Sequence, residues 1–429
     1  LHRLIRRQRQ MCIRDSHSTE IEKNSKRCTK RMYLTPEEEK ILNGEEGESK
    51  RKAMEILVAL GRIFKAKRLI PIESAQIAGV SYKSIGEAGL KWLKSMKDAR
   101  VIVPSTLNPA GMDLVQWRLM GIDEEFARKQ NEIIEIFREV GVYISCTCIP
   151  YLSGNLPRFG SHIAWSESSA VCYANSVIGA RTNREGGPSA LAAAIIGKTP
   201  LYGLHIDENR KANQLVEVLT SLEQESDYGA LGYLIGKELK SCIPFFRGIK
   251  NCSLDNLKAL GAALAAAGNI SMYHIEEVTP EARKAIVDKI EKIEVDVDDI
   301  KRAYEDLTTG SSEDVDLIAI GCPHASLSEI RRVAEMINGK RVRRSRKLWV
   351  FTSINMKEIA DRSGYTAKIE KAGGKVLTDC CMVVAPIEKM NFRTVATNSA
   401  KAAVYLPSMS KVDVVFCKIE DCIRIAVGD

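Results

Sequence analysis

The chain has 429 residues and an ordinary globular composition, 45% hydrophobic and 28% charged, and no stretch reaches the roughly 18 uninterrupted apolar residues of a membrane span. Its length exceeds that at which one hydrophobic core keeps growing, so we expect more than one structural unit and no membrane contact. The net charge of +8 does not indicate a nucleic-acid partner, because residues 1–31 carry ten Lys or Arg against three Asp or Glu, and the remainder has a net charge of only +1.

Residues 1–31 lack hydrophobic periodicity and lack the apolar core of a secretory signal. Their RQRQMCIRDS portion resembles translated adapter or vector sequence, and an Arg-rich targeting peptide is the alternative. The stretch from Met32, MYLTPEEEKILNG, is typical of a genuine start, in which Thr35 caps a helix that has Pro36 at its first position. We therefore treat residues 1–31 as a non-native or disordered tail.

Helical periodicity extends over Glu37–Lys65 and Asp123–Val140, and between them ARVIVPSTLNPAG predicts a buried strand that leads into a loop. The same pattern of a short apolar strand and a loop recurs at GVYIS, VDLIAIG, KLWVFTS and GGKVLT. Such strands, alternating with helices, predict an α/β fold of parallel sheets flanked by helices. Loops that follow parallel strands meet at the carboxyl edge of the sheet, where open α/β folds bind their ligands.

The stretch from Gly186 to Ala267 has a different composition, since GGPSALAAAIIGK and LKALGAALAAAGN predict close-packed helices. A charged segment between residues 270 and 300 indicates a domain boundary. We expect a multi-lobed chain, with a catalytic lobe at residues 32–290 that contains a helical insert. Residues 291–429 would form a second α/β lobe that completes the site.

Ten cysteines lie outside the tail, and the absence of a secretion signal predicts a reducing, cytoplasmic location without structural disulfides. Half of them follow predicted strands, namely Cys146, Cys148, Cys322, Cys380 and Cys381. No paired CxxC motifs of a zinc site are present, and a cluster held by thiolates from separate strands fits this distribution better. Core packing is the alternative for all five, and we predict it for the rest, which are Cys172, Cys242, Cys252, Cys417 and Cys422.

Five motifs resemble the successive signatures of aconitase X, a branch of the aconitase superfamily. They are TCIPYL, AWSESSAVCYANSVIGARTNREGG, IGCPHASLSEI, TDCCMVVAP and TNSAKAAVYLP, and the resemblance runs from about Met32 to the C-terminus. It implies an aconitase-like fold without the swivelling domain that some relatives carry fused. The family's cluster cysteines map to Cys148, Cys322 and Cys381. Cys380 occupies a position that is often threonine in the family, so the choice between Cys380 and Cys381 rests on alignment to the following apolar run.

Three cysteines in place of four imply an iron–sulfur cluster, expected to be 4Fe-4S, with one iron open as a Lewis acid for dehydration. Family members dehydrate either cis-3-hydroxyproline or mevalonate 5-phosphate, the latter in archaea as a two-subunit enzyme. This chain has the length of the large subunit. The resemblance therefore implies a small swivelling-domain partner subunit that supplies the general base, a serine.

Candidate substrate contacts follow from the motifs. Gly79, Val80 and Ser81 in IAGVS offer backbone amides to an anion, with an ordinary turn as the alternative. The resemblance places Asn108 and Pro109 beside the substrate. The remaining candidates are the polar pair Glu167 and Ser168, which could instead form a buried network, and the cations Arg181 and Lys401, which could instead be solvated. His324 would either support Cys322 or cap the next helix.

The resemblance implies conversion of (R)-5-phosphomevalonate to trans-anhydromevalonate 5-phosphate and water, in the archaeal mevalonate route to isoprenoids. A cis-3-hydroxy-L-proline dehydratase is the alternative enzyme. An iron-sensing, RNA-binding aconitase relative is the alternative from another class, and the net charge of +1 outside the tail disfavours it.

Overall fold

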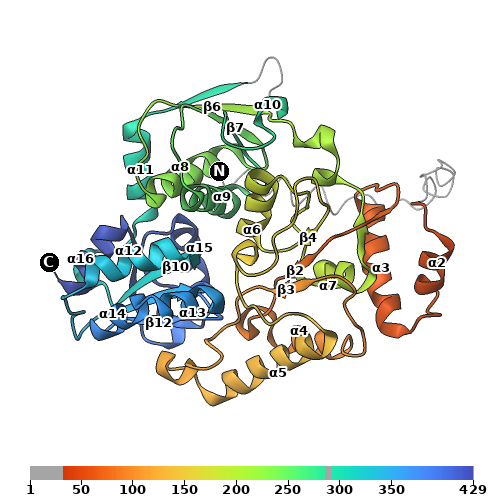
Figure 1. Ribbon diagram of the computed structural model, residues 1–429, viewed down its shortest axis with the longest axis horizontal. Helices are drawn as coiled ribbons and strands as arrows, with labels where there is room; N and C mark the ends of the chain where they lie inside the picture. Colours follow the sequence, from red (N-terminus) through yellow and green to blue (C-terminus); the bar gives the residue numbers. More distant parts are fainter. Residues whose placement is uncertain (1–31, 286–290, 429) are drawn as a thin grey trace, which may run out of the picture.

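The computed structural model describes residues 32–285 and 291–428. The predicted tail at residues 1–31 lies outside them. Within the described residues the strands form four sheets, three of them wholly parallel, and helices pack around these sheets (Figure 1). The α/β prediction is therefore confirmed. No helix in this part of the chain is long and apolar enough to cross a bilayer.

The first part of the chain forms a three-stranded parallel sheet in the order β3-β2-β4. Its strands are β2 (Ala75–Ile77), β3 (Ser105–Leu107) and β4 (Ala164–Trp165). A two-stranded antiparallel sheet pairs β1 (Leu69–Pro71) with β5 (Lys198–Pro200). The helices of this part are α2 (Pro36–Leu42), α3 (Glu48–Ile63), α4 (Tyr82–Lys94), α5 (Glu124–Val140), α6 (Ser168–Tyr173) and α7 (Gly187–Ile196).

Local signals explain several of these boundaries. Thr35 and Glu38 form the capping box of α2, and Asp123 caps α5, as their positions in the sequence predicted. The helix expected over Glu37–Lys65 is divided, because the residues between α2 and α3 include two glycines in the left-handed region. The strand expected within ARVIVP begins only after Pro104, as β3, because proline has no N–H for a sheet ladder.

The middle of the chain forms a four-stranded parallel sheet in the order β8-β7-β6-β9. Its strands are β6 (Gln214–Val218), β7 (Pro244–Arg247), β8 (His274–Ile275) and β9 (Lys292–Val295), and its helices are α8 (Glu225–Leu239), α9 (Leu254–Gly268), α10 (Ala282–Ala285) and α11 (Val297–Leu307). Helices α8 and α9 lie side by side (Figure 1), and a Cβ on Gly268 would lie 2.6 Å from the backbone of Gly236. This close approach requires small residues, as the alanine-rich sequence predicted. Because β9 follows residue 290, the sheet draws strands from both sides of the predicted boundary, and the two-lobe division stays a prediction.

The last part forms a five-stranded parallel sheet in the order β12-β11-β10-β13-β14. Its strands are β10 (Leu317–Ala325), β11 (Lys347–Thr352), β12 (Lys375–Leu377), β13 (Thr394–Thr397) and β14 (Asp413–Phe416). Its helices are α12 (Leu327–Ile337), α13 (Ile354–Arg362), α14 (Tyr365–Lys371), α15 (Ala400–Ser410) and α16 (Ile419–Val427). Every residue of β10 is buried, which explains its continuous apolar sequence.

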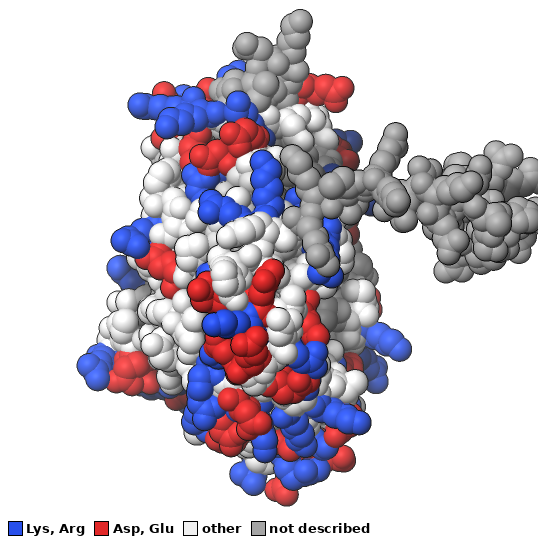
Figure 2. Space-filling model, turned by 90° about the vertical axis from the view of Figure 1, so that its right-hand side faces the viewer, with Lys and Arg blue, Asp and Glu red and all other residues white. Residues whose placement is uncertain are grey.

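Charged side chains of both signs are interspersed on the face shown in Figure 2, where basic residues form no separate area. This distribution agrees with the balance of 53 basic and 52 acidic residues outside the tail. Surfaces that bind nucleic acid carry a basic stripe or patch. The face in Figure 2 lacks that feature.

Candidate functional site

Three segments that are far apart in the sequence bring Cys148, Cys322 and Cys381 together. Cys148 lies just before a short turn of helix, Cys322 lies within β10, and Cys381 follows β12. Their exposed fractions are 4%, 6% and 6%. The thiols of Cys322 and Cys381 are in hydrogen-bonding contact, which lowers the pKa of Cys381 to about 7. Burial raises the pKa of Cys148 to about 12, and the neighbouring charge of Lys401 opposes that rise.

The geometry of β10 presents Cys322. The strand was expected to end at Gly321, but it continues to Ala325, with a register shift against β11 between Ile320 and Ala325. Gly321 adopts a φ of +101°, and a Cβ there would lie 2.1 Å from the Phe351 carbonyl oxygen. Only glycine fits this conformation and this approach. Cys322 was expected on a loop after the strand, and it lies instead within the irregular part of β10.

Cys146 and Cys380 have different surroundings. Cys146 is fully buried in the hydrophobic cluster of the first part of the chain. The Sγ atom of Cys380 lies 3.8 Å from Sδ of Met120. Burial raises the pKa of both thiols well above the ordinary value. Both thiols lie in hydrophobic clusters, and the choice of Cys381 over Cys380 as a ligand stays a prediction.

A buried ion pair lies beside these three thiols. Lys401, on α15, pairs with Glu167, which precedes α6, and the Oε2 atom of Glu167 accepts a hydrogen bond of 2.7 Å from Nδ2 of Asn108. Ser169 donates to the same carboxylate at 3.0 Å, and Ser168 does so at 3.4 Å. Burial alone would raise the pKa of Glu167, but Lys401 and these donors lower it to about 2. Glu167 is therefore a carboxylate held in a fixed position.

The positive charge of Lys401 also acts on the three thiols. It lowers the pKa values of Cys148, Cys322 and Cys381, although burial acts in the opposite direction on each. Lys401 and Cys322 both line a small cavity of about 20 Å³, together with Gly321 and Ser399. The ion pair and the thiols thus form one site between the first and last parts of the chain.

The IAGVS turn contacts the loop that carries Cys381. The Ser81 hydroxyl donates to the Val384 carbonyl at 2.8 Å, and the Val80 carbonyl accepts from Nε2 of Gln130 at 2.9 Å. Gly79 adopts a φ of +77° and lines an apolar cavity of about 190 Å³. Pro109 is buried, and the next residue bridges to Cys380. The Ser81 hydroxyl and the Val80 carbonyl are therefore engaged within the chain, and the role of the Gly79–Ser81 backbone amides in substrate binding stays a prediction.

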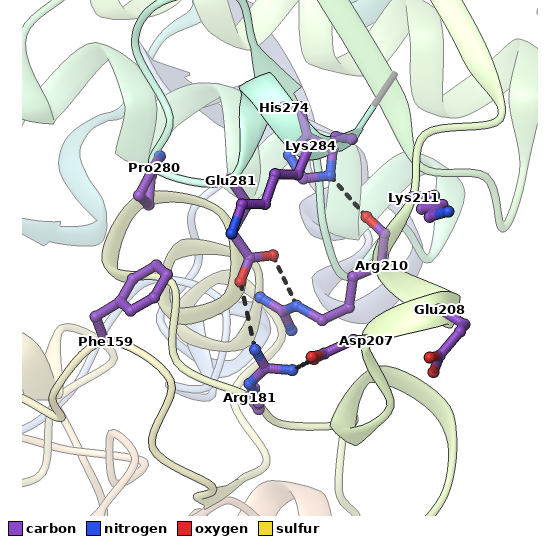
Figure 3. A pocket seen from close by; sticks show the side chains of 11 residues that line it. Phe159, Arg181, Asp207, Glu208, Arg210, Lys211, His274, Pro280, Glu281 and Lys284 are labelled. Carbon is purple, nitrogen blue, oxygen red and sulfur yellow. Dashed lines mark hydrogen bonds and ion pairs between the residues drawn. The ribbon is translucent and has the colours of Figure 1, made fainter. Parts of the chain in front are cut away.

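Arg181 lies in another place. Its guanidinium forms an ion pair with Asp207 and lies 3.9 Å from Glu281, which is also paired with Arg210 (Figure 3). These residues line a pocket of about 340 Å³ to which none of the five loop cysteines contributes. The structure therefore does not bring Arg181 together with Lys401 and the thiols.

Two further features of the site were missed or misjudged. Lys258 is buried on α9, where it pairs with Glu329 and with Asp255 at 3.1 Å. A lone lysine in the apolar sequence LKALGAALAAAG was the available signal for a buried partner. The prediction that His324 caps the next helix is wrong, because Ser326 caps α12 and Glu329 completes its capping box. His324 contacts Cys148 through its backbone N–H.

The donor set at this site has a definite chemistry. In the described part of the chain, no three His, Cys, Asp or Glu side chains are grouped as a single metal ion requires. Iron–sulfur clusters are bound by cysteine thiolates, and a cluster is larger than a single metal ion. Three thiols from separate segments fit such a cluster. Cys148, Cys322 and Cys381 are therefore the residues that could hold such a group.

Comparisons with known proteins agree with these observations. Models of the first, second and third domains of aconitase X match residues 31–208, 212–305 and 315–428. The phosphomevalonate dehydratase large subunit of Methanocaldococcus jannaschii is 58% identical over 92% of this chain and 100% of its own. Cis-3-hydroxy-L-proline dehydratase of Pseudomonas aeruginosa is 35% identical over 90% of this chain and 69% of its own.

The crystal structure of Thermococcus kodakaraensis aconitase X in its holo-form superposes with a TM-score of 0.87. It is 50% identical, and the match covers 92% of this chain and 100% of that one. The sequence and the fold thus agree over nearly the whole described chain. The chain belongs to the aconitase X family.

Proposed function

We propose that this chain is the large subunit of a phosphomevalonate dehydratase. It would remove water from (R)-5-phosphomevalonate to give trans-anhydromevalonate 5-phosphate, in the cytoplasm, as a step of the archaeal mevalonate route. The observation that supports this most directly is the group of three buried thiols beside the Glu167–Lys401 ion pair. Full-length similarity to proteins named as that subunit supports the choice of substrate.

In this proposal Cys148, Cys322 and Cys381 hold a 4Fe-4S cluster. When bound, a cluster with one iron free of protein ligands supplies a Lewis acid for the substrate hydroxyl. The polar side chains nearby, Asn108, Glu167, Ser168 and Lys401, would orient the substrate's charged groups. Arg181 is not included, because Asp207 and Glu281 occupy its guanidinium.

The ion pair performs a defined task in this scheme. The fixed carboxylate of Glu167 holds the Lys401 ammonium beside the thiols, and the buried environment strengthens the attraction of that ammonium for an anionic group. Asn108 holds the second carboxylate oxygen. The turn from Gly79 to Ser81 and Pro109 would close the site from the first part of the chain.

The proton must leave the carbon next to the substrate carboxylate as the carbon–oxygen bond breaks, so that a double bond and water result. We assign this general base to a small swivelling-domain subunit, as the name "large subunit" of the relatives implies a partner. The active enzyme would then be a heterodimer.

The test uses the purified chain, loaded anaerobically with ferrous iron and sulfide and mixed with its small subunit. We expect it to dehydrate phosphomevalonate, measured by mass spectrometry of the product, and to do so only when both subunits are present. Turnover of cis-3-hydroxy-L-proline without turnover of phosphomevalonate would favour the second family activity. Binding of structured RNA without either turnover would contradict both dehydratase assignments.

A further inference from the structure

The side chain of His324 joins the other two cysteine-bearing loops. It is fully buried, with an exposed fraction of 0%. Its Nε2 atom lies 2.9 Å from the Cys380 carbonyl oxygen, and its Nδ1 atom lies 2.9 Å from Oγ1 of Thr147. Thr147 precedes Cys148, and Cys380 precedes Cys381. The imidazole therefore spans the gap between the segments that carry these two thiols.

The partners determine which ring nitrogen carries the proton. A carbonyl oxygen only accepts, so Nε2 of His324 must donate to Cys380. The bare Nδ1 then accepts from the Thr147 hydroxyl, whose oxygen in turn accepts from the Ile149 N–H at 3.2 Å. Each polar atom of the ring has a partner in one consistent direction of donation, and the buried imidazole is held in a single orientation.

The backbone of His324 adds two more contacts. Its N–H donates to Sγ of Cys148 at 3.1 Å, and its carbonyl accepts from Nζ of Lys258 at 3.2 Å. Its own segment carries Cys322 two residues earlier. One residue thus contacts the segments of all three thiols and is tied to α9 through Lys258.

We propose that His324 is a positioning residue that sets the spacing of the three cysteine-bearing segments. The proposal rests on the proposed function only for the identity of the group that the thiols hold. Removing the ring leaves a cavity, in which the Cys380 carbonyl loses its donor and the Thr147 O–H loses its acceptor. The loops then lose their common anchor, although each cysteine is still present.

The first experiment needs no metal. In the cluster-free chain, alkylation of individual cysteines is followed by peptide mass spectrometry, and we compare His324→Ala with His274→Ala. His274 is a matched control, because it is 1% exposed and its Nε2 also contacts a carbonyl oxygen, that of Arg210, at 2.8 Å. We expect Cys148 and Cys381 to react faster only in His324→Ala, whereas Cys172 stays protected in both. Equal rates at Cys148 and Cys381 in the two variants would overturn the proposal.

The second experiment uses the reconstituted chain. Substitutions that disturb the support of metal ligands commonly weaken metal binding about 10- to 100-fold, and we expect iron release to a chelator to accelerate by a factor in that range in His324→Ala. Thr147→Val should change iron release in the same direction, whereas Thr147→Ser, which keeps the hydroxyl, should behave as wild type. The visible absorption of the remaining cluster should also shift, which a loss of global stability alone does not cause.

The outcomes separate the two proposals. A wild-type chain that takes up no iron and sulfide contradicts the proposed function, and the alkylation result still decides the role of His324. A wild-type chain that loads normally, together with unchanged iron release in His324→Ala and Thr147→Val, contradicts the positioning role alone. If His324→Ala does not fold, the comparison of iron release between Thr147→Val and Thr147→Ser tests the positioning role instead.

Discussion

Glu167 and Lys401, 234 residues apart in the chain, form a buried ion pair beside three cysteine thiols. Glu167 belongs to the first part of the fold and Lys401 to the last. Their side chains are 11% and 8% exposed. The pair therefore links the first and last parts of the fold at the candidate site. It places one negative and one positive charge at fixed positions there.

Breaking this pair should be costly. Lys401→Ala leaves the Glu167 carboxylate buried without its cation, and we expect the free energy of unfolding to fall by about 3–5 kcal/mol. The control is Lys237→Ala, because Lys237 pairs with Asp306 on the surface, where the two side chains are 55% and 49% exposed. That control should change stability by less than about 1 kcal/mol. Urea unfolding under anaerobic conditions measures the free energy of unfolding of both variants. Equal losses would show that the buried pair stabilises the fold no more than the surface pair does.

Serine substitutions should divide the five loop cysteines into two groups. Cys148→Ser, Cys322→Ser and Cys381→Ser should each lose the visible absorbance of a reconstituted cluster, because a serine hydroxyl does not replace a thiolate. Cys146→Ser and Cys380→Ser should retain it and lose only stability, since they introduce a hydroxyl into an apolar environment. Loss of the absorbance in Cys380→Ser with its retention in Cys381→Ser would reverse the assignment of these neighbours.

Two adjacent glycines offer a matched pair for the turn near the site. A Cβ on Gly187 would lie 2.4 Å from the Ala78 carbonyl oxygen, whereas the nearest atom to a Cβ on Gly186 is 3.8 Å away. We expect Gly187→Ala to lower the free energy of unfolding by about 1–3 kcal/mol, because the backbone before Gly79 must move. Gly186→Ala should stay within about 0.5 kcal/mol of wild type. Denaturant unfolding measures the free energy of unfolding of the two variants. Equal values would contradict the tight packing of α7 against Ala78.

Acid should destabilise the chain through buried histidine. Burial, together with electrostatic interactions with His162, Arg210 and Arg181, lowers the pKa of His205 from 6.5 to about 3. Between about pH 3 and 6.5, His205 is protonated in the unfolded state but stays neutral in the folded state. Its contribution to stability is therefore complete above pH 6.5 and declines as the pH falls towards 3. At pH 5 the loss from this residue is about 2 kcal/mol.

The measurement is the free energy of unfolding at several pH values between 5 and 7. In His205→Gln the slope against pH should be smaller than in wild type. It should not vanish, because burial also lowers the pKa values of His162, His274 and His324. The raised pKa values of the buried carboxyls Glu329 and Asp379 act in the opposite direction on the total, so the comparison between the two proteins is decisive. An unchanged slope in His205→Gln would contradict the burial of neutral His205.

The sequence predicted the fold class well because its signals are local. Continuous apolar runs such as that of β10 identify buried parallel strands, and the caps at Thr35 and Asp123 identify helix starts. The family followed from long motifs, and the comparisons confirm it. The extent of β10 was missed, because a register shift depends on the neighbouring strand and leaves no pattern in the sequence.

The site is less accessible to sequence reasoning because its contacts are not local. The motif residues Asn108, Glu167 and Lys401 lie together in the structure, and their roles stay predictions. Arg181 belongs to the same motif as Glu167, yet it lies in another place, and its partners Asp207 and Glu281 lie outside that motif. A charged residue in a sequence does not reveal which opposite charge the fold brings to it. The same holds for Lys258 and Glu329.

The distance along the chain between the segments of the site bears on when it can form during synthesis. His324 contacts Cys148 across 176 positions, and Lys401 contacts Glu167 across 234. The wall that contains Cys148 leaves the ribosome long before α15 exists, and long loops close slowly. The Glu167–Lys401 pair can therefore form only after α15 has been synthesised, and a chain truncated before α15 should retain folded first-part elements without this pair.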